Sequence, residues 1–127
     1  MKKREQKQPS KMLKQELQKM RVRDKYLLKK YGISLIEYED LLEAQGGACA
    51  ICKRPPLKNR LSVDHLHTKD KKGKQVRGDK STVRGLCCMF CNHKILGAIE
   101  RRNVVKPYDV LLGVIEYFNK YPIKGGK

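Results

Sequence analysis

Two Cys-x-x-Cys pairs form the most specific chemical pattern in the chain: Cys49-Ala-Ile-Cys52 and Cys88-Met-Phe-Cys91, separated by 35 residues (53–87). Each pair can present two thiolates from a tight turn to one tetrahedral zinc ion. We therefore predict a structural zinc ion held by these four cysteines, which would staple the two ends of the intervening insert and contribute to folding. A redox role is the lesser alternative, because there are two pairs and no βαβ pattern surrounds either.

The fifth cysteine, Cys87, precedes the second pair. An odd number of cysteines in a chain without a visible export signal argues against a disulfide framework. Cys87 and Cys91 could also form a Cys-x-x-x-Cys pair, but the matched spacing of the two pairs is simpler. We expect Cys87 to be a small buried hydrophobic residue.

Between the two pairs lies the stretch LSVDHLH, residues 61–67, with an aspartate and two histidines within four positions. If zinc takes four sulfurs, these side chains are released for catalysis or for packing. The alternation at its start predicts a strand, in which His65 and His67 point to one face and Asp64 to the other. For Asp64 and His65 to share a site, the strand must bulge or turn there.

The elements around these residues can be predicted from capping residues and periodicity. A helix over residues 10–31 should end at Gly32, because glycine favours the left-handed conformation that terminates helices. A second helix should begin at Ser34, with Glu37 completing a capping box, and end at Gly46-Gly47. Residues 1–9 are charged and polar and are expected to be disordered.

Farther along, residues 81–86 can return as a second strand after a lysine-rich loop over residues 69–80. Residues 92–101 predict a helix, and residues 107–120 another that starts with proline. The region from the LSVDHLH stretch to the helix after the last cysteine is then a strand, loop, strand, helix unit pinned by zinc. The predicted fold is α+β and mostly helical.

The charge of the chain favours a polyanionic partner. Lysine and arginine number 30 against 13 acidic residues, giving a formal net charge of +17 at pH 7. The excess is greatest in residues 1–31 and 53–84, on either side of an acidic segment. No long apolar run, signal segment or acylation motif is visible, so we expect a small soluble cytoplasmic protein with no membrane partner.

The helix predicted over residues 10–31 is basic but also carries a short apolar seam, interrupted by Asp24. Three interpretations stay open: a solvated helix packed on the domain, contact with a DNA backbone, and pairing into a homodimer. The seam consists of Leu13, Leu17, Met20, Leu27 and Tyr31.

The motifs VDHLH and VRGLCCMFCN, framed by the cysteine pairs and preceded by YEDLLEAQGGACAIC, together resemble the recombination endonuclease VII family of HNH nucleases. The resemblance covers roughly residues 32–121 and implies a zinc-stapled ββα-metal (His-Me finger) core with flanking helices. We accordingly predict an HNH endonuclease domain over residues 32–121. A basic tail and helix at 1–31, for DNA contact or oligomerisation, would precede it, and a C-terminal tail at 122–127 would follow.

The resemblance also assigns roles to individual residues. It implies that His65 is the general base and that Asp64 and Asn92 hold a catalytic divalent ion. Family members often read DHDH where this chain has DHLH, with Leu66 in place of the second acid. Arg84 could face the scissile phosphate, and His67 could orient the site or contact DNA.

The chemistry of these residue types fits those roles. A neutral imidazole, with an ordinary pKa near ~6.5, can accept a proton from water near neutral pH. A carboxylate and an amide oxygen form a hard site suited to Mg²⁺ or Mn²⁺, with water and phosphate completing the shell. Thiolates suit zinc, so the two metal tasks separate by ligand type. Asn92 could instead only cap the helix that follows it.

The lysine-rich loop lies beside the predicted site. It could be a solvated turn, but its position favours a clamp on the DNA backbone, and its glycines, Gly73 and Gly78, favour mobility until DNA binds. The residues that could make these contacts are Lys69, Lys71, Lys72, Lys74 and Arg77.

Two classes of function follow. The first is a metal-dependent DNA endonuclease that nicks or cuts DNA with little sequence preference, with branched or junction DNA among its candidate substrates. The second is a non-catalytic zinc module that grips nucleic acid through charge. Only the first predicts cleavage. The family resemblance places such an enzyme in a bacterial or phage-infected cell.

Overall fold

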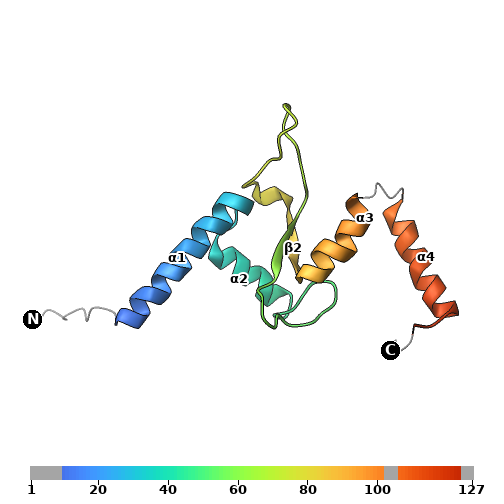
Figure 1. Ribbon diagram of the computed structural model, residues 1–127, viewed down its shortest axis with the longest axis horizontal. Helices are drawn as coiled ribbons and strands as arrows, with labels where there is room; N and C mark the ends of the chain where they lie inside the picture. The colour runs from blue at the N-terminus through green and yellow to red at the C-terminus, as the bar shows by residue number, and fades with distance from the viewer. Residues whose placement is uncertain (1–9, 102–105, 124–127) are drawn as a thin grey trace, which may run out of the picture. The chain divides into compact units, whose positions relative to one another are not determined.

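The fold is α+β and mostly helical, as predicted (Figure 1). The computed structural model describes residues 10–101 and 106–123, so the predicted disorder of residues 1–9 lies outside the described residues, as does part of the predicted C-terminal tail. The elements are α1 (Lys11–Tyr31), α2 (Leu35–Ala44), β1 (Ser62–His65), η1 (Lys80–Thr82), β2 (Val83–Cys87), η2 (Cys91–Leu96), α3 (Gly97–Arg101) and α4 (Pro107–Lys120).

The chain divides into two compact units, the first ending at Cys88 and the second beginning at Met89. The first unit contains α1, α2 and the two strands, and the second contains η2, α3 and α4. Within the described ranges, no helix combines the length and apolar composition needed to cross a membrane.

The helix α1 has the predicted limits. The Ser10 hydroxyl accepts a hydrogen bond from the Leu13 N–H at 3.2 Å, and Gly32 follows the last turn with φ of +76°. A Cβ atom at Gly32 would collide with the backbone of Gly78 and Lys80. Glycine is therefore needed here both for its conformation and for the close approach of α1 to the segment before β2.

The start of α2 is held by two side chains. Ser34 Oγ accepts a hydrogen bond from the Glu37 N–H at 3.1 Å, as predicted for the N-cap. Asp24 of α1 accepts a hydrogen bond from the Leu35 N–H at 2.8 Å. The Glu37 carboxylate, which a full capping box would direct at Ser34, pairs with Lys80 at 3.0 Å. The cap of α2 therefore also ties α1 and the segment before β2 to this helix.

The strands β1 and β2 pair antiparallel and form a two-stranded sheet. The Tyr38 hydroxyl donates to the Leu61 carbonyl at 2.7 Å, joining α2 to the start of β1. The Gln45 side chain donates to the Leu86 carbonyl at 2.9 Å and accepts from the Leu86 N–H at 2.8 Å, joining the end of α2 to β2. The buried hydrophobic residues of this unit are Leu27, Ile33, Tyr38, Cys49, Leu61, Val63, Leu86 and Cys87.

Two element boundaries differ from the prediction. The second strand was predicted from residue 81 and begins at Val83, because Asp79 accepts hydrogen bonds from the N–H and the hydroxyl of Ser81 and starts a 3-10 turn. The helix predicted from residue 92 already begins at Met89, and residues 91–96 form a π-helix before α3 continues. The predicted final helix matches α4 and has proline at its first turn.

Candidate metal centre and catalytic site

Four cysteine sulfurs form one cluster. The Sγ atoms of Cys49, Cys52, Cys88 and Cys91 all lie within 4.8 Å of one another. Cys49 and Cys91 are buried, and none of the five cysteines, all of which belong to the described residues, forms a disulfide. Four sulfurs are a donor set that zinc takes in structural sites, so these residues fit a metal ion in number and type.

Backbone hydrogen bonds shape the first cysteine pair. The Cys49 N–H donates to the Arg54 carbonyl at 3.0 Å, and the Lys53 N–H donates to the Cys49 carbonyl at 3.1 Å, which makes a tight turn. Lys53 has a φ of +63° in this turn. The Ala50 N–H donates to the Leu86 carbonyl at 3.0 Å, so the turn is attached to β2, whose end leads directly to Cys88.

Two of the buried cysteines, Cys49 and Cys87, differ in acidity. Burial raises the pKa of the Cys49 thiol, but the backbone N–H groups of Cys88, Cys52 and Ile51 that donate to its sulfur outweigh this effect and lower the pKa to about 6. Burial, with the neighbouring Cys49 thiolate, raises the pKa of Cys87 to about 12. Cys49 is therefore suited to be a metal ligand, whereas Cys87 is the buried neutral thiol predicted from the sequence.

The pairing of β1 with β2 has a bulge beside Asp64 and His65, and the extra residue of the bulge lies on β2. Asp64 pairs with Gly85, but His65 pairs with Val83, so the register shifts between Asp64 and His65 and Arg84 is the extra residue on β2. The sequence predicted that β1 would bulge or turn between Asp64 and His65. The irregularity is at this position, but the extra residue belongs to β2 and not to β1.

Asp64 and Arg84 form a bidentate ion pair. Arg84 Nε donates to Asp64 Oδ2 and Arg84 Nη2 donates to Asp64 Oδ1, each at 2.8 Å. Asp64 is 7% exposed, whereas the side chain of Arg84 is 34% exposed. A buried carboxylate requires such a partner, because an isolated charge in the interior is costly. Sequence reasoning did not anticipate this pair, since only the bulge brings the two residues into this geometry.

His65 is half-buried beside the bulge. Its ring meets the Tyr31 ring edge-on, with the centroids 5.1 Å apart, and its Nδ1 lies 3.5 Å from the Val63 carbonyl oxygen. Burial lowers the pKa of His65 below its ordinary value, and the adjacent His67 acts in the same direction. The imidazole is therefore predominantly neutral at pH 7, the form that accepts a proton.

His67 lies next to His65 and connects to the lysine-rich loop. The ring centroids of the two histidines are 4.7 Å apart, and the Gln75 amide donates to His67 Nδ1 at 2.9 Å. Because the amide N–H donates to Nδ1, the neutral form of His67 carries its proton on Nε2. His67 itself is exposed, so it can reach a ligand at the surface.

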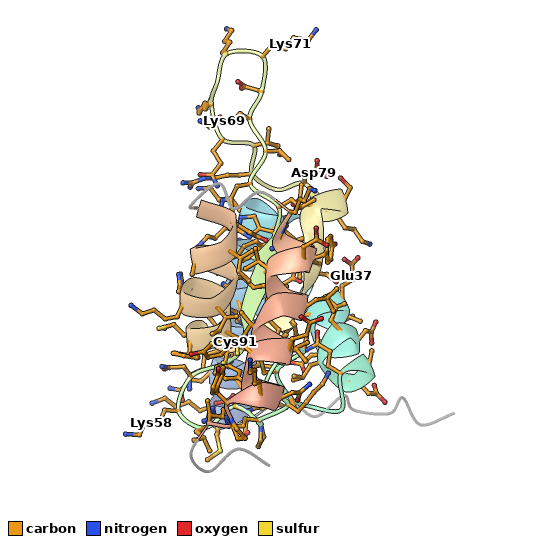
Figure 2. The ribbon with its side chains drawn as sticks, turned by 90° about the vertical axis from the view of Figure 1, so that its right-hand side faces the viewer. Glu37, Lys58, Lys69, Lys71, Asp79 and Cys91 are labelled. Carbon is orange, nitrogen blue, oxygen red and sulfur yellow. The ribbon has the colours of Figure 1, made fainter. Side chains whose placement is uncertain are left out.

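The lysine-rich loop has a hairpin form. The Val76 N–H donates to the Thr68 carbonyl at 2.9 Å and the Asp70 N–H donates to the Lys74 carbonyl at 2.8 Å. Figure 2 shows Lys71 at the end of this projecting hairpin, residues 68–78, with Lys69 closer to its base. The basic residues that the sequence singled out are all exposed: Lys69, Lys71, Lys72, Lys74 and Arg77.

Asn92 belongs to the second unit. It is the second residue of η2 and is half-buried, and it follows Cys91 of the cysteine cluster. Phe90 occupies the N-cap position of η2, so the alternative that Asn92 caps this helix is wrong. The backbone is already helical at Met89, three residues before the predicted start. The amide of Asn92 can supply an oxygen to a divalent ion.

Two polar residues that support the site were missed from the sequence. Gln45 fixes β2 through the backbone of Leu86, and Asp24 fixes α2 through the Leu35 N–H. Gln45 directly precedes the glycines that end α2, and Asp24 interrupts an apolar seam. The positions of both residues in the sequence could have drawn attention to them. No spacing rule, however, connects either residue to its distant backbone partner.

Comparison with known proteins gives one family. The model of the recombination endonuclease VII family matches residues 24–120, well over half of the chain. The match begins before residue 32, where the sequence motifs placed it, and includes Asp24 and Leu27. This agrees with the packing, because Leu27 is fully buried and Asp24 holds the start of α2.

The similar curated proteins come from phages. The "Gene 59 protein" of Mycobacterium phage D29 is 41% identical over 97 residues, which are 76% of this chain and 49% of that relative. The "Gene 59 protein" of Mycobacterium phage L5 is 46% identical over 72 residues, which are 56% of this chain and 37% of that relative. The chain thus spans half or less of the length of these relatives. No solved structure matches it.

Proposed function

Because the chain belongs to the recombination endonuclease VII family, we propose that it is an HNH-type endonuclease that hydrolyses phosphodiester bonds in DNA with a divalent ion. The observation that supports the proposal is a buried carboxylate, Asp64, followed on β1 by a half-buried imidazole, His65, where the register with β2 shifts. In the proposed ββα-metal core, β1 and β2 supply the two strands and residues 91–101 supply the helix.

We assign His65 as the general base. With its pKa lowered by burial, the ring is neutral at physiological pH and can take a proton from the attacking water. A proton on Nδ1, which faces the Val63 carbonyl, leaves Nε2 as the acceptor. The edge-on contact with Tyr31 restricts the ring orientation, which favours a fixed position for the water.

We assign Asp64 and Asn92 as ligands of the catalytic ion, Mg²⁺ or Mn²⁺. A carboxylate and an amide oxygen are ligand types that these hard cations prefer. Asp64 is buried and Asn92 is half-buried. When bound, the ion would supply positive charge to the phosphate and to the leaving oxygen. The pairing of β1 with β2 would hold the Asp64 carboxylate in place.

The cysteine cluster is proposed to bind zinc for structure. Its four sulfurs join the turn after α2 to the end of β2 and the start of η2, which come much later in the sequence. A zinc ion on these ligands would therefore hold together the strands that present the catalytic residues. Soft thiolates take zinc and hard oxygens take the catalytic ion, so each ion has its own ligands.

DNA is proposed to bind through its backbone. The hairpin at residues 68–78 presents exposed basic side chains on the same connection that begins with His67, two residues after His65. The base of the hairpin is fixed to α1, since the Gly78 N–H donates to the Lys30 carbonyl at 3.0 Å. Contacts of this kind neutralise phosphates without reading bases, so binding should weaken steeply as salt increases.

The proposal is tested by a cleavage assay. The purified, zinc-loaded chain is incubated with supercoiled plasmid in Mg²⁺, in Mn²⁺ and with no divalent ion, and nicked and linear products are measured on gels. Metal-dependent cleavage supports an endonuclease. Salt-sensitive binding without cleavage under any of these conditions would instead support a non-catalytic nucleic-acid module. Linear, single-stranded and four-way-junction DNA in the same assay identify the preferred substrate.

A further inference from the structure

The ion pair between Asp64 and Arg84 occupies the atoms that the proposed function needs for metal binding. Both carboxylate oxygens of Asp64 accept hydrogen bonds of 2.8 Å from the guanidinium. A divalent ion on Asp64 must approach one of these same two oxygens. The two cations would repel one another at that distance, so they cannot both keep their full contact with the carboxylate.

The two partners differ in their freedom to move. Asp64 is fixed on β1 between the buried residue Val63 and the bulge, and only 10% of its side chain is exposed. Arg84 reaches Asp64 from the surface, with 34% of its side chain exposed. A long side chain that is one third exposed can turn outward into water without opening the core. When the pair separates, Arg84 is therefore the side chain that moves.

The bulge explains why Arg84 is in this position. In a regular ladder the residue before Gly85 on β2 would stand opposite His65, but here Val83 is opposite His65 and Arg84 is the additional residue. From this position the guanidinium of Arg84 reaches both carboxylate oxygens of Asp64.

From these contacts we propose that Arg84 is a built-in competitor of the divalent ion at Asp64. In the metal-free protein, Arg84 neutralises the buried carboxylate of Asp64 and thereby stabilises the fold. Metal binding requires Arg84 to release at least one of the two carboxylate oxygens. Arg84 thereby raises the metal concentration needed to fill the site. This inference rests on the proposed role of Asp64 as a metal ligand, and it makes Arg84 a positioning residue for metal binding.

Metal affinity measured without DNA tests this proposal. Mn²⁺ binding to the full zinc-loaded chain is followed by electron paramagnetic resonance of the unbound ion. The Arg84→Gln variant should bind Mn²⁺ about tenfold more tightly than the wild type, since a directly competing charged hydrogen-bonding partner has been removed. The Lys58→Gln variant loses the same charge from an exposed position away from the hairpin and should leave Mn²⁺ affinity unchanged (Figure 2).

Two further variants make every outcome decisive. Arg84→Lys keeps the charge but loses the two-pronged contact, so it should fold even if Arg84→Gln does not, and it should bind Mn²⁺ more tightly than the wild type. A folded Arg84→Lys or Arg84→Gln protein with wild-type or weaker affinity overturns the competitor role. The Asp64→Asn variant separates this failure from that of the proposed function. If Asp64→Asn binds Mn²⁺ as well as the wild type does, Asp64 is not the ligand and both proposals fail.

Discussion

The cysteine cluster and the Asp64 region are two polar sites that β2 connects, because Arg84 lies on β2 and Cys88 directly follows it, but they are organised differently. The cysteine cluster contains ligands of one kind that are close in space, and backbone N–H groups lower the pKa of one of them, Cys49. Asp64 has a carboxylate that another side chain of the protein already holds. The first arrangement is ready for a metal ion and suits a permanent one. In the second, the proposed catalytic ion would have to displace a protein contact, which suits an ion that is bound only during catalysis.

The largest difference between the two regions should appear when a ligand is removed. Cys88→Ser should lose zinc and leave the first unit unfolded, because binding of a structural zinc ion contributes on the order of 10 kcal/mol to folding. Circular dichroism and elemental analysis measure the two losses. Cys87→Ala is the matched control: the neighbouring thiol is outside the cluster and should cost only about 1 kcal/mol, with zinc retained. A folded, zinc-free Cys88→Ser protein would contradict the structural role of the cluster.

Loss of the acidic ligand should have a smaller effect on the fold. Asp64→Asn leaves Arg84 without its carboxylate but removes no metal from the cysteines, and Arg84 can turn into solvent. We expect a loss of about 2 kcal/mol in the free energy of unfolding, measured by urea denaturation, together with loss of cleavage. Zinc content should stay at one ion per chain. Loss of zinc from the Asp64→Asn variant would show that zinc binding by the cysteine cluster depends on Asp64.

Changes in the hairpin should affect DNA binding and leave both metal sites intact. Replacing Lys71, Lys72 and Lys74 by glutamine should weaken DNA affinity about tenfold at moderate salt. It should also reduce the slope of log affinity against log salt by about 2 to 3, since each lost phosphate contact contributes roughly 0.9. Fluorescence anisotropy across a salt series measures both quantities. An unchanged slope would show that these lysines do not contact phosphates.

The smallest effect is expected at Asp24. Its carboxylate accepts a hydrogen bond from the first N–H of α2, so Asp24→Ala should destabilise the chain by about 1 kcal/mol and leave zinc content and cleavage unchanged. Thermal unfolding followed by circular dichroism detects this loss. Asp24→Asn, which keeps an oxygen acceptor, should recover most of it. Equal stability of Asp24→Ala and the wild type would show that the bond contributes nothing.

The sequence predicted the parts of the structure that depend on local chemistry. Ser10, Gly32 and Ser34 act at their own helix ends, and the even spacing of the two cysteine pairs indicates one shared cluster. Each of these inferences requires only neighbouring residues or a repeated spacing.

The remaining features depend on register and on contacts between distant segments. Asp64 and Arg84 are twenty positions apart, and their pairing depends on a one-residue shift between β1 and β2 that no local pattern determines. The 3-10 turn before β2 and the π-helical start of η2 also shifted the predicted boundaries. Such shifts change which side chains meet, so the partner of a correctly identified aspartate could not be predicted from the sequence.

The measurement that tests the central claim most directly is cleavage of supercoiled plasmid by the wild type and by His65→Ala, in Mn²⁺, with zinc content and DNA affinity determined on the same samples. If His65 is the general base and the cysteines serve only the fold, the cleavage rate of His65→Ala should fall by a factor of about 10² to 10⁴. It should keep one zinc ion per chain and bind DNA within about twofold of the wild type, because His65 is assigned neither to the cysteine cluster nor to the phosphate contacts. Cleavage by His65→Ala at the wild-type rate would contradict the assignment of His65 as the general base.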